Sequence, residues 1–128
     1  MYCVQVTAQE ISDIRNFIDL LNMESKSAVI VEGKRDSFAL RQLGFTGVVL
    51  EFHHFNGLIR FADHAARYEK LIFLFDGDRK GKYLTARLIE NLQRRTKVDL
   101  TFKKKLVSIT KGKIRFIEQM IFYESYLA

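Results

Sequence analysis

The sequence predicts a three-layer α/β/α fold, in which a parallel sheet of about four strands is covered by helices on both faces. Short, continuous apolar runs recur along the chain, and such runs are typical of strands that are buried on both faces. Segments with apolar residues at helical spacing separate these runs, and alternating strands and helices indicate a parallel sheet. Because the 128 residues contain no internal repeat and no Gly/Ser-rich linker, we expect a single domain over residues 1–128.

An amphipathic helix is predicted at residues 8–24, ahead of the expected core at residues 27–102. Thr7 and Glu10 have the spacing of a capping box, the side-chain pattern that starts many helices. Apolar residues then recur at helical intervals, at Ile11, Ile14, Ile18 and Leu21. We therefore expect this flanking helix to cover the core with its apolar side.

The strands and helices of the core follow from the same two patterns. The apolar runs that we expect to form strands are residues 28–32, 48–52, 71–76 and 98–102. The helical patterns cover residues 36–43, 58–68, 82–95 and 114–127. Residues 103–128 are thus expected to contain a basic run and then a last helix, with Ile117, Met120 and Ile121 turned inward.

The net charge of +6 is unevenly distributed along the chain. Residues 77–115 contain thirteen Lys and Arg against three Asp and Glu, whereas the flanking segments are slightly acidic. A basic segment of this kind favours a polyanionic partner, nucleic acid first, although an ordinary solvated helix face has the same composition. On charge alone, both interpretations stay open.

The sequence also indicates the cellular compartment of the protein. No apolar run approaches the length of a membrane-spanning helix, and the first residues do not have the pattern of a signal peptide. The single cysteine, Cys3, has no partner for an internal disulfide, which suits a reducing compartment. We therefore expect a cytoplasmic protein without a membrane partner.

Acidic residues follow two of the predicted strands, in the stretches EGKRD, residues 32–36, and DGDRKG, residues 76–81. Ligands bind beyond the carboxyl ends of parallel strands, so Glu32, Asp76 and Asp78 are candidates for one site. Two such charges about 4 Å apart repel by about 4 kcal/mol at an effective dielectric constant of about 20. A hard divalent cation such as Mg²⁺ relieves this repulsion, because it prefers oxygen ligands. The alternative, that Asp76 and Asp78 are only turn and helix-cap residues, stays open.

These two stretches resemble the motifs of a known family. EGKRD after an apolar strand, followed further along by LIFLFDGDRKG, resembles the Toprim domain. This domain is shared by primases, type IA and type II topoisomerases, OLD-type nucleases, recombination-mediator proteins and a ribosomal-RNA maturation nuclease. The resemblance covers residues 27–95, and the tail at residues 103–118 is similar to the small stand-alone archaeal Toprim proteins.

The resemblance implies a role for each matching residue. Glu32 matches the family's general acid or base, which can also join the metal, and Asp76 and Asp78 match its metal-binding acids. The remaining motif positions are Gly33, Asp36, Gly57 and Gly81. The implied cofactor is Mg²⁺, with Mn²⁺ as an alternative. For Glu32 to meet the two aspartates, the first and third strands must be neighbours, which favours the strand order 2-1-3-4.

The implied function is Mg²⁺-dependent phosphodiester chemistry on nucleic acid, with nuclease-type cleavage as the leading hypothesis. Basic side chains near the acids are expected to neutralise phosphates without reading base sequence: Lys34, Arg35, Arg79, Lys80, Lys82, Lys103, Lys104 and Lys105. A second hypothesis is a non-catalytic adaptor that binds metal and nucleic acid in a repair or RNA-processing complex. The sequence leaves open whether DNA or RNA is bound, and which oligomer or protein complex the chain forms.

Overall fold

Four parallel strands form the central sheet in the order β2-β1-β3-β4, which confirms the predicted fold class and strand order. The computed structural model describes residues 6–114 and 117–127, so Cys3 lies outside the described residues. The strands are β1 (Ser27–Val31), β2 (Val49–Glu51), β3 (Lys70–Phe73) and β4 (Lys97–Asp99). β1 pairs directly with β3, with Ile30 opposite Phe73, so two strands that are far apart in the sequence are neighbours.

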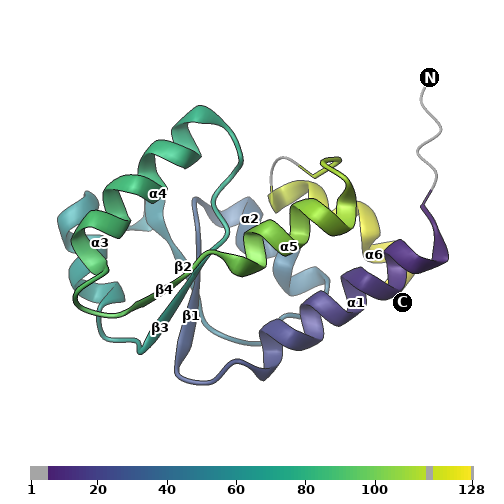
Figure 1. The fold of residues 1–128 in the computed structure, drawn as a ribbon, viewed down its shortest axis with the longest axis horizontal. Coiled ribbons are helices and arrows are strands. Elements are labelled where there is room, and N and C mark those ends of the chain that lie inside the picture. The colour runs from purple at the N-terminus through teal and green to yellow at the C-terminus, as the bar shows by residue number, and fades with distance from the viewer. Residues whose placement is uncertain (1–5, 115–116, 128) are drawn as a thin grey trace.

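Helices cover both faces of this sheet: α3 and α4 lie on one face, and α1, α2 and α5 lie on the other (Figure 1). The α-helices are α1 (Ala8–Met23), α2 (Lys34–Gln42), α3 (Leu58–Ala65), α4 (Arg79–Leu92), α5 (Thr101–Thr110) and α6 (Glu124–Leu127). Two 3₁₀ helices are η1 (Phe52–His54) and η2 (Ile117–Tyr123). Within residues 6–114 and 117–127, no helix is long and apolar enough to cross a membrane.

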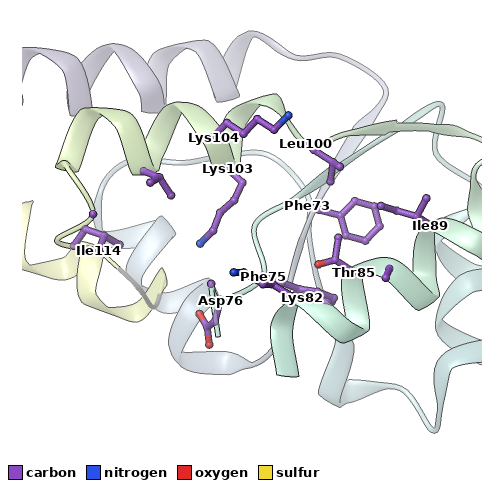
Figure 2. Close-up of a pocket in the computed structure, with 14 residues that line it drawn as sticks. Phe73, Phe75, Asp76, Lys82, Thr85, Ile89, Leu100, Lys103, Lys104 and Ile114 are labelled. Atoms are coloured by element: carbon purple, nitrogen blue, oxygen red, sulfur yellow. The ribbon is translucent and has the colours of Figure 1, made fainter. Parts of the chain in front are cut away.

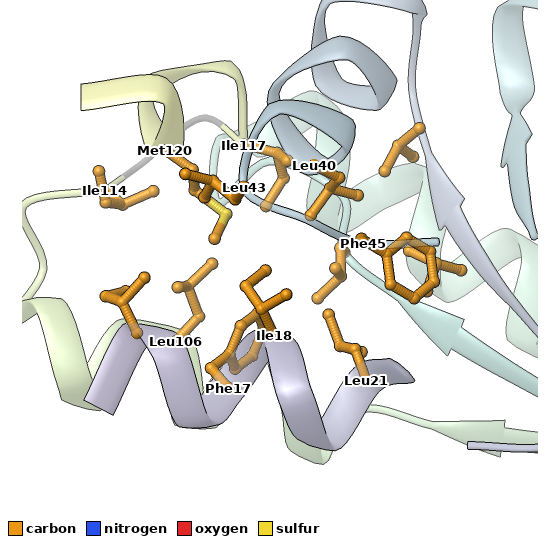
Figure 3. Close-up of a cluster of buried hydrophobic side chains, with 14 of the residues drawn as sticks. Phe17, Ile18, Leu21, Leu40, Leu43, Phe45, Leu106, Ile114, Ile117 and Met120 are labelled. Carbon is orange, nitrogen blue, oxygen red and sulfur yellow. The ribbon is translucent and has the colours of Figure 1, made fainter. Parts of the chain in front are cut away.

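Two apolar cores enclose the sheet, because successive side chains of each strand point to opposite faces. Along β1, Ala28 and Ile30 pack on one side, whereas Val29 and Val31 pack on the other. The α3/α4 core includes Ala28, Ile30, Phe61, Ala62, Phe73, Leu88 and Leu92. The α1/α5 core, shown in Figure 3, includes Val29, Val31, Phe17, Ile18, Leu21, Leu40, Leu106, Ile117 and Met120. Burial on both faces explains why the strands are continuously apolar in the sequence.

The prediction of a strand at residues 98–102 is wrong at its C-terminal end. β4 ends at Asp99, and α5, which the sequence pattern did not predict, begins at Thr101. The cause is local: the Oδ1 of Asp99 accepts hydrogen bonds from the backbone N–H of Thr101 at 2.7 Å and from its hydroxyl at 2.6 Å. An aspartate in this position favours a helix start. The lysines at 103–105 therefore lie within a helix and not beyond a strand end.

The prediction of one long helix at residues 114–127 is also wrong, and residues 115–116 of that range lie outside the described residues. The segment forms the 3₁₀ helix η2 and then the short helix α6. A 3₁₀ helix aligns every third residue, which places Ile117, Met120 and Tyr123 together in the interior. Ile121, which was expected to face inward, is 39% exposed.

Glu10 connects the beginning of the chain to its end. Its backbone N–H donates to the hydroxyl of Thr7 at 3.0 Å, as expected for a helix cap at the start of α1. Its buried carboxylate accepts a hydrogen bond from the Tyr123 hydroxyl at 3.0 Å and lies 2.7 Å from the Lys113 ammonium. A buried carboxylate is tolerated only with such partners, so this contact holds α1 against the C-terminal segment.

We expect Tyr123→Phe to lower the free energy of unfolding by about 1.5–3 kcal/mol, the usual range for a hydrogen bond to a charged group. Urea denaturation measures the change. Tyr126→Phe is the matched control, because Tyr126 is 41% exposed and its hydroxyl is not part of this contact. Equal stability of the two variants would contradict the role of the Glu10 contact.

Candidate functional site

Four acidic residues lie where β1 and β3 end. Glu32 directly follows β1, and Asp76 follows β3 after a short segment without regular secondary structure. Asp36 lies in the first turn of α2, and Asp78 is the N-cap residue of α4. Because β1 and β3 are paired, the segments that leave them emerge side by side, which is the usual ligand-binding position in a parallel sheet.

Glu32 is buried at 8% exposure, and its Oε1 atom has no hydrogen-bond partner. Burial raises the pKa of the Glu32 carboxyl to about 7. The negative charges of Asp76, Asp78 and Asp36 act on that pKa in the same direction. The positive charge of Lys80 opposes them. Glu32 is therefore a carboxyl group that can gain or lose a proton near neutral pH.

Asp36 and Gly33 form the start of α2. The Oδ2 of Asp36 accepts a hydrogen bond from the backbone N–H of Gly33 at 3.1 Å. Burial raises the pKa of the Asp36 carboxyl. The backbone of Gly33 is extended, and a Cβ atom there would lie 3.5 Å from the nearest atom, Nδ1 of His53. A glycine is thus not required at position 33 by the fold, in contrast to position 81.

The loop from Asp76 to Gly81 is wound tightly. The Oδ1 of Asp78 accepts a hydrogen bond from the backbone N–H of Gly81 at 2.7 Å, which caps α4. A Cβ atom on Gly81 would lie 2.0 Å from the carbonyl oxygen of Asp76, so only glycine fits. The Oδ1 of Asp76 accepts a hydrogen bond from the backbone N–H of Ile117 at 3.1 Å, and burial raises its pKa.

Lys103 differs from the two lysines that follow it. Its Nζ atom is buried and has no hydrogen-bond partner, whereas Lys104 and Lys105 are exposed. Figure 2 shows the Lys103 side chain pointing toward Asp76, with Lys104 directed away. Burial lowers the pKa of the Lys103 ammonium, and the carboxylates of Asp76 and Asp36 oppose that shift. The structure thus places a cation against the acids, which the uniform run of lysines in the sequence did not indicate.

The other predicted basic residues are exposed and surround the same strand ends. Lys34 and Arg35 occupy the first turn of α2. Arg79, Lys80 and Lys82 occupy the first turn of α4. Arg35 lies 3.9 Å from Glu118, a residue of η2 whose charge also raises the pKa of Asp36. Gly57, the remaining motif glycine, has φ = 101° at the N-cap of α3, a conformation that favours glycine.

The donor atoms at this site suit a hard divalent cation. They are carboxylate oxygens, and one of them, Oε1 of Glu32, is buried without a partner. Among residues 6–114 and 117–127, however, no three His, Cys, Asp or Glu side chains are arranged closely enough to hold a metal ion. Mg²⁺ commonly takes only one or two carboxylates and keeps several waters, so these residues fit that ion without forming a closed cage.

A comparison with models of known protein families shows the family of this chain. The model of the Toprim domain matches residues 27–118. The chain belongs to the Toprim family. Toprim domains generally bind divalent metal ions such as Mg²⁺, and membership implies a metal-dependent function related to nucleic acid.

Similar proteins have similar lengths. A UPF0292 protein of Thermococcus sibiricus is 33% identical over 121 residues, which cover 94% of this Toprim chain and 93% of the relative. A UPF0292 protein of Archaeoglobus fulgidus is 34% identical over 111 residues, covering 84% and 86%. A solved structure of a protein from Aquifex aeolicus has a TM-score of 0.68 at 27% identity and covers 81% of this chain and 94% of that one. The two archaeal relatives agree with the predicted resemblance to small archaeal Toprim proteins.

We expect Gly81→Ala to lower the free energy of unfolding by about 1–3 kcal/mol, because the added methyl group must displace the backbone at Asp76. Gly33→Ala is the control, since its added methyl group meets only ordinary contacts. Urea denaturation of both variants measures the difference. If they were equally stable, the tight loop would not be the reason for glycine at position 81.

The raised pKa of Glu32 determines how stability varies with pH. The carboxyl pKa is about 7 in the folded chain against an ordinary value of 4.5, so the folded chain binds this proton more tightly than the unfolded chain does. The proton's contribution to the free energy of unfolding is therefore complete below pH 4.5. That contribution is lost as the pH rises through 7. Glu32→Gln cannot ionise, so above that pH it should unfold with a free energy higher than wild type by up to about 3 kcal/mol.

Urea denaturation in EDTA across this pH range measures the effect of Glu32→Gln. Glu90→Gln, which changes an exposed residue of α4, is the control and should follow wild type throughout. A constant difference between Glu32→Gln and wild type at every pH would show that Glu32 does not titrate as described.

Proposed function

We propose that this Toprim protein cleaves phosphodiester bonds in nucleic acid in a Mg²⁺-dependent reaction at the site around Glu32, Asp76 and Asp78. The observation that carries the proposal is the buried Glu32 carboxyl, whose Oε1 has no partner and whose pKa is raised by burial and, in the same direction, by the neighbouring aspartates. Family membership supports the metal and nucleic-acid parts of the proposal. The cleavage itself is the part that the proposal adds.

Asp76 and Asp78 would hold the metal ion, through the carboxylate oxygens that their backbone hydrogen bonds leave available. When bound, Mg²⁺ supplies Lewis acidity toward a phosphoryl oxygen and stabilises the leaving oxygen. Glu32 would either join the metal or transfer the proton. A pKa of about 7 suits the second role, because a general acid or base works best when its pKa lies near the working pH.

The basic residues would bind the phosphates on either side of the cleaved bond. Lys34 and Arg35 begin α2, and Arg79 and Lys80 begin α4, so each pair adds side-chain charge to a helix N-terminus that already favours anions. The buried ammonium of Lys103 faces the acids, so we assign it to the reacting phosphate. Lys104 and Lys105 are exposed on α5, together with Lys82 on α4, and suit flanking phosphates. Such contacts read no base sequence.

A non-catalytic adaptor is the second candidate, and the loop before α4 supplies the observation that favours it. Asp78 already caps α4, and Asp76 already binds the backbone of Ile117. Both aspartates therefore have a structural task that needs no chemistry. A module that only binds metal and nucleic acid needs no proton transfer by Glu32, so the two candidates differ in what Glu32 does.

Cleavage is tested by incubating wild type and Glu32→Gln with labelled single- and double-stranded DNA and RNA, in Mg²⁺, Mn²⁺ or EDTA. We expect metal-dependent cleavage by wild type and a loss of about 10²-fold or more in Glu32→Gln, the usual effect of removing an acid–base group. Binding should change less than about twofold, because the basic surface is intact. Glu90→Gln is the matched control and should cleave like wild type.

Two results would favour the adaptor instead. One is full activity in Glu32→Gln, and the other is no metal-dependent cleavage of any of these nucleic acids by wild type. Full activity in Glu32→Gln would mean that the cleavage does not depend on this site, and no cleavage by wild type would mean that the site catalyses none. In both cases binding would be the remaining function of the site.

The different surroundings of the three lysines predict different defects. The double variant Lys104→Glu with Lys105→Glu should weaken duplex binding for every sequence and reduce the slope of log affinity against log salt by about 2, since each phosphate contact contributes about 0.9. Lys103→Met should reduce that slope by no more than about 0.9, the contribution of one phosphate contact, and should reduce cleavage. Fluorescence anisotropy at several salt concentrations measures the slopes. Equal slopes in the two proteins would contradict the separate role of Lys103.

A further inference from the structure

A pocket of about 670 Å³ lies between α4 and α5, next to the acids (Figure 2). Ala86 and Ile89 of α4 form one wall, and Val107 of α5 belongs to the opposite wall. Phe73 and Phe75, from β3 and the segment after it, also line the pocket, although both are almost fully buried in the α3/α4 core. Its volume is that of a site for a small organic group, and its lining is mainly apolar.

Charged residues border this apolar pocket at the end nearest the acids. Lys82, Lys103 and Lys104 line it, and so does Asp76. Lys103 and Asp76 therefore belong both to the pocket and to the candidate catalytic site. A ligand that fits must combine a flat or apolar part with an adjoining anionic part, because a purely apolar group would not bind the positive charges of the three lysines.

We propose that this pocket receives an unpaired nucleobase, and that the protein acts on nucleic acid in which at least one base is not paired. The proposal rests on the proposed function, because it places the phosphate next to that base at Lys103 and Asp76. Bases stack on aromatic and apolar side chains without regard to sequence, and lysines bind the backbone beside them. In a duplex, the base must first be unpaired and unstacked, which costs a few kcal/mol. Single strands, loops and frayed ends are therefore the substrate class.

The test fills the pocket with a bulky side chain from either wall. Ala86→Trp places an indole on the α4 wall, and Val107→Trp places one on the α5 wall; both positions are exposed. Ser108→Trp is the matched control, because Ser108 is the exposed neighbour of Val107 and does not line the pocket. Two independent walls keep the test valid if one variant does not fold, which circular dichroism reveals.

Fluorescence anisotropy in EDTA measures the binding of a labelled single strand and of a blunt duplex containing the same sequence. Both pocket variants should bind the single strand about tenfold more weakly or worse, the effect of losing one stacked base. Their duplex affinity should change less than about twofold, and Ser108→Trp should match wild type on both nucleic acids.

The outcomes separate the pocket from the catalytic proposal. If the folded pocket variants bind the single strand like wild type, or lose single-strand and duplex binding equally, the nucleobase proposal is overturned while metal-dependent cleavage still stands. If wild type cleaves nothing but its single-strand binding is sensitive to both pocket variants, cleavage fails and the nucleobase proposal is supported. If wild type binds neither nucleic acid, both proposals are overturned.

Discussion

The direct pairing of β1 with β3 is the constraint on which the candidate site depends. The two strands are separated in the sequence by β2, the α-helices α2 and α3 and the 3₁₀ helix η1, yet their backbones are hydrogen-bonded along the sheet. This pairing brings Glu32 and Asp76 together at the carboxyl ends of the two strands. The first turns of α2 and α4 lie at the same end of the sheet. Each face of the paired strands is covered by its own apolar core, so the acids rest on a framework that is fixed from both sides.

The site holds two buried carboxyl groups, Glu32 and Asp36, next to the partly buried Asp76 and Asp78, and this concentration of negative charge opposes folding. Elements outside the central strands reduce that cost. α5 supplies the buried ammonium of Lys103, and η2 supplies the backbone N–H of Ile117 to Asp76. The Oε1 of Glu32 still has no partner. An unsatisfied buried oxygen of this kind is common where a protein keeps a group available for chemistry rather than for stability.

The sheet and the positions of the acids could be predicted because apolar runs and strand-end carboxylates are local sequence signals. The strand order is not a local signal, and it was predicted because the resemblance requires Glu32 to meet the two aspartates. α5 was missed although Phe102, Leu106 and Ile109 have helical spacing, since three consecutive lysines obscured it. The inward direction of Lys103 depends on that helix and could not be inferred without it. In the last segment, the apolar residues fit both an α-helix and a 3₁₀ helix, so only tertiary packing decides between them.

The two cores differ in how much of the chain each requires. The buried members of the α3/α4 core that the structure describes fall between Ala28 and Leu92, whereas those of the α1/α5 core range from Ile14 to Tyr123. In a chain synthesised from its N-terminus, all buried residues of the α3/α4 core are therefore present before the last residues of the α1/α5 core have been added. Ile117 is one of these last residues, and its backbone N–H donates the hydrogen bond to Asp76. During translation, the hydrogen bond that positions Asp76 can therefore form only after all four strands of the sheet have been synthesised.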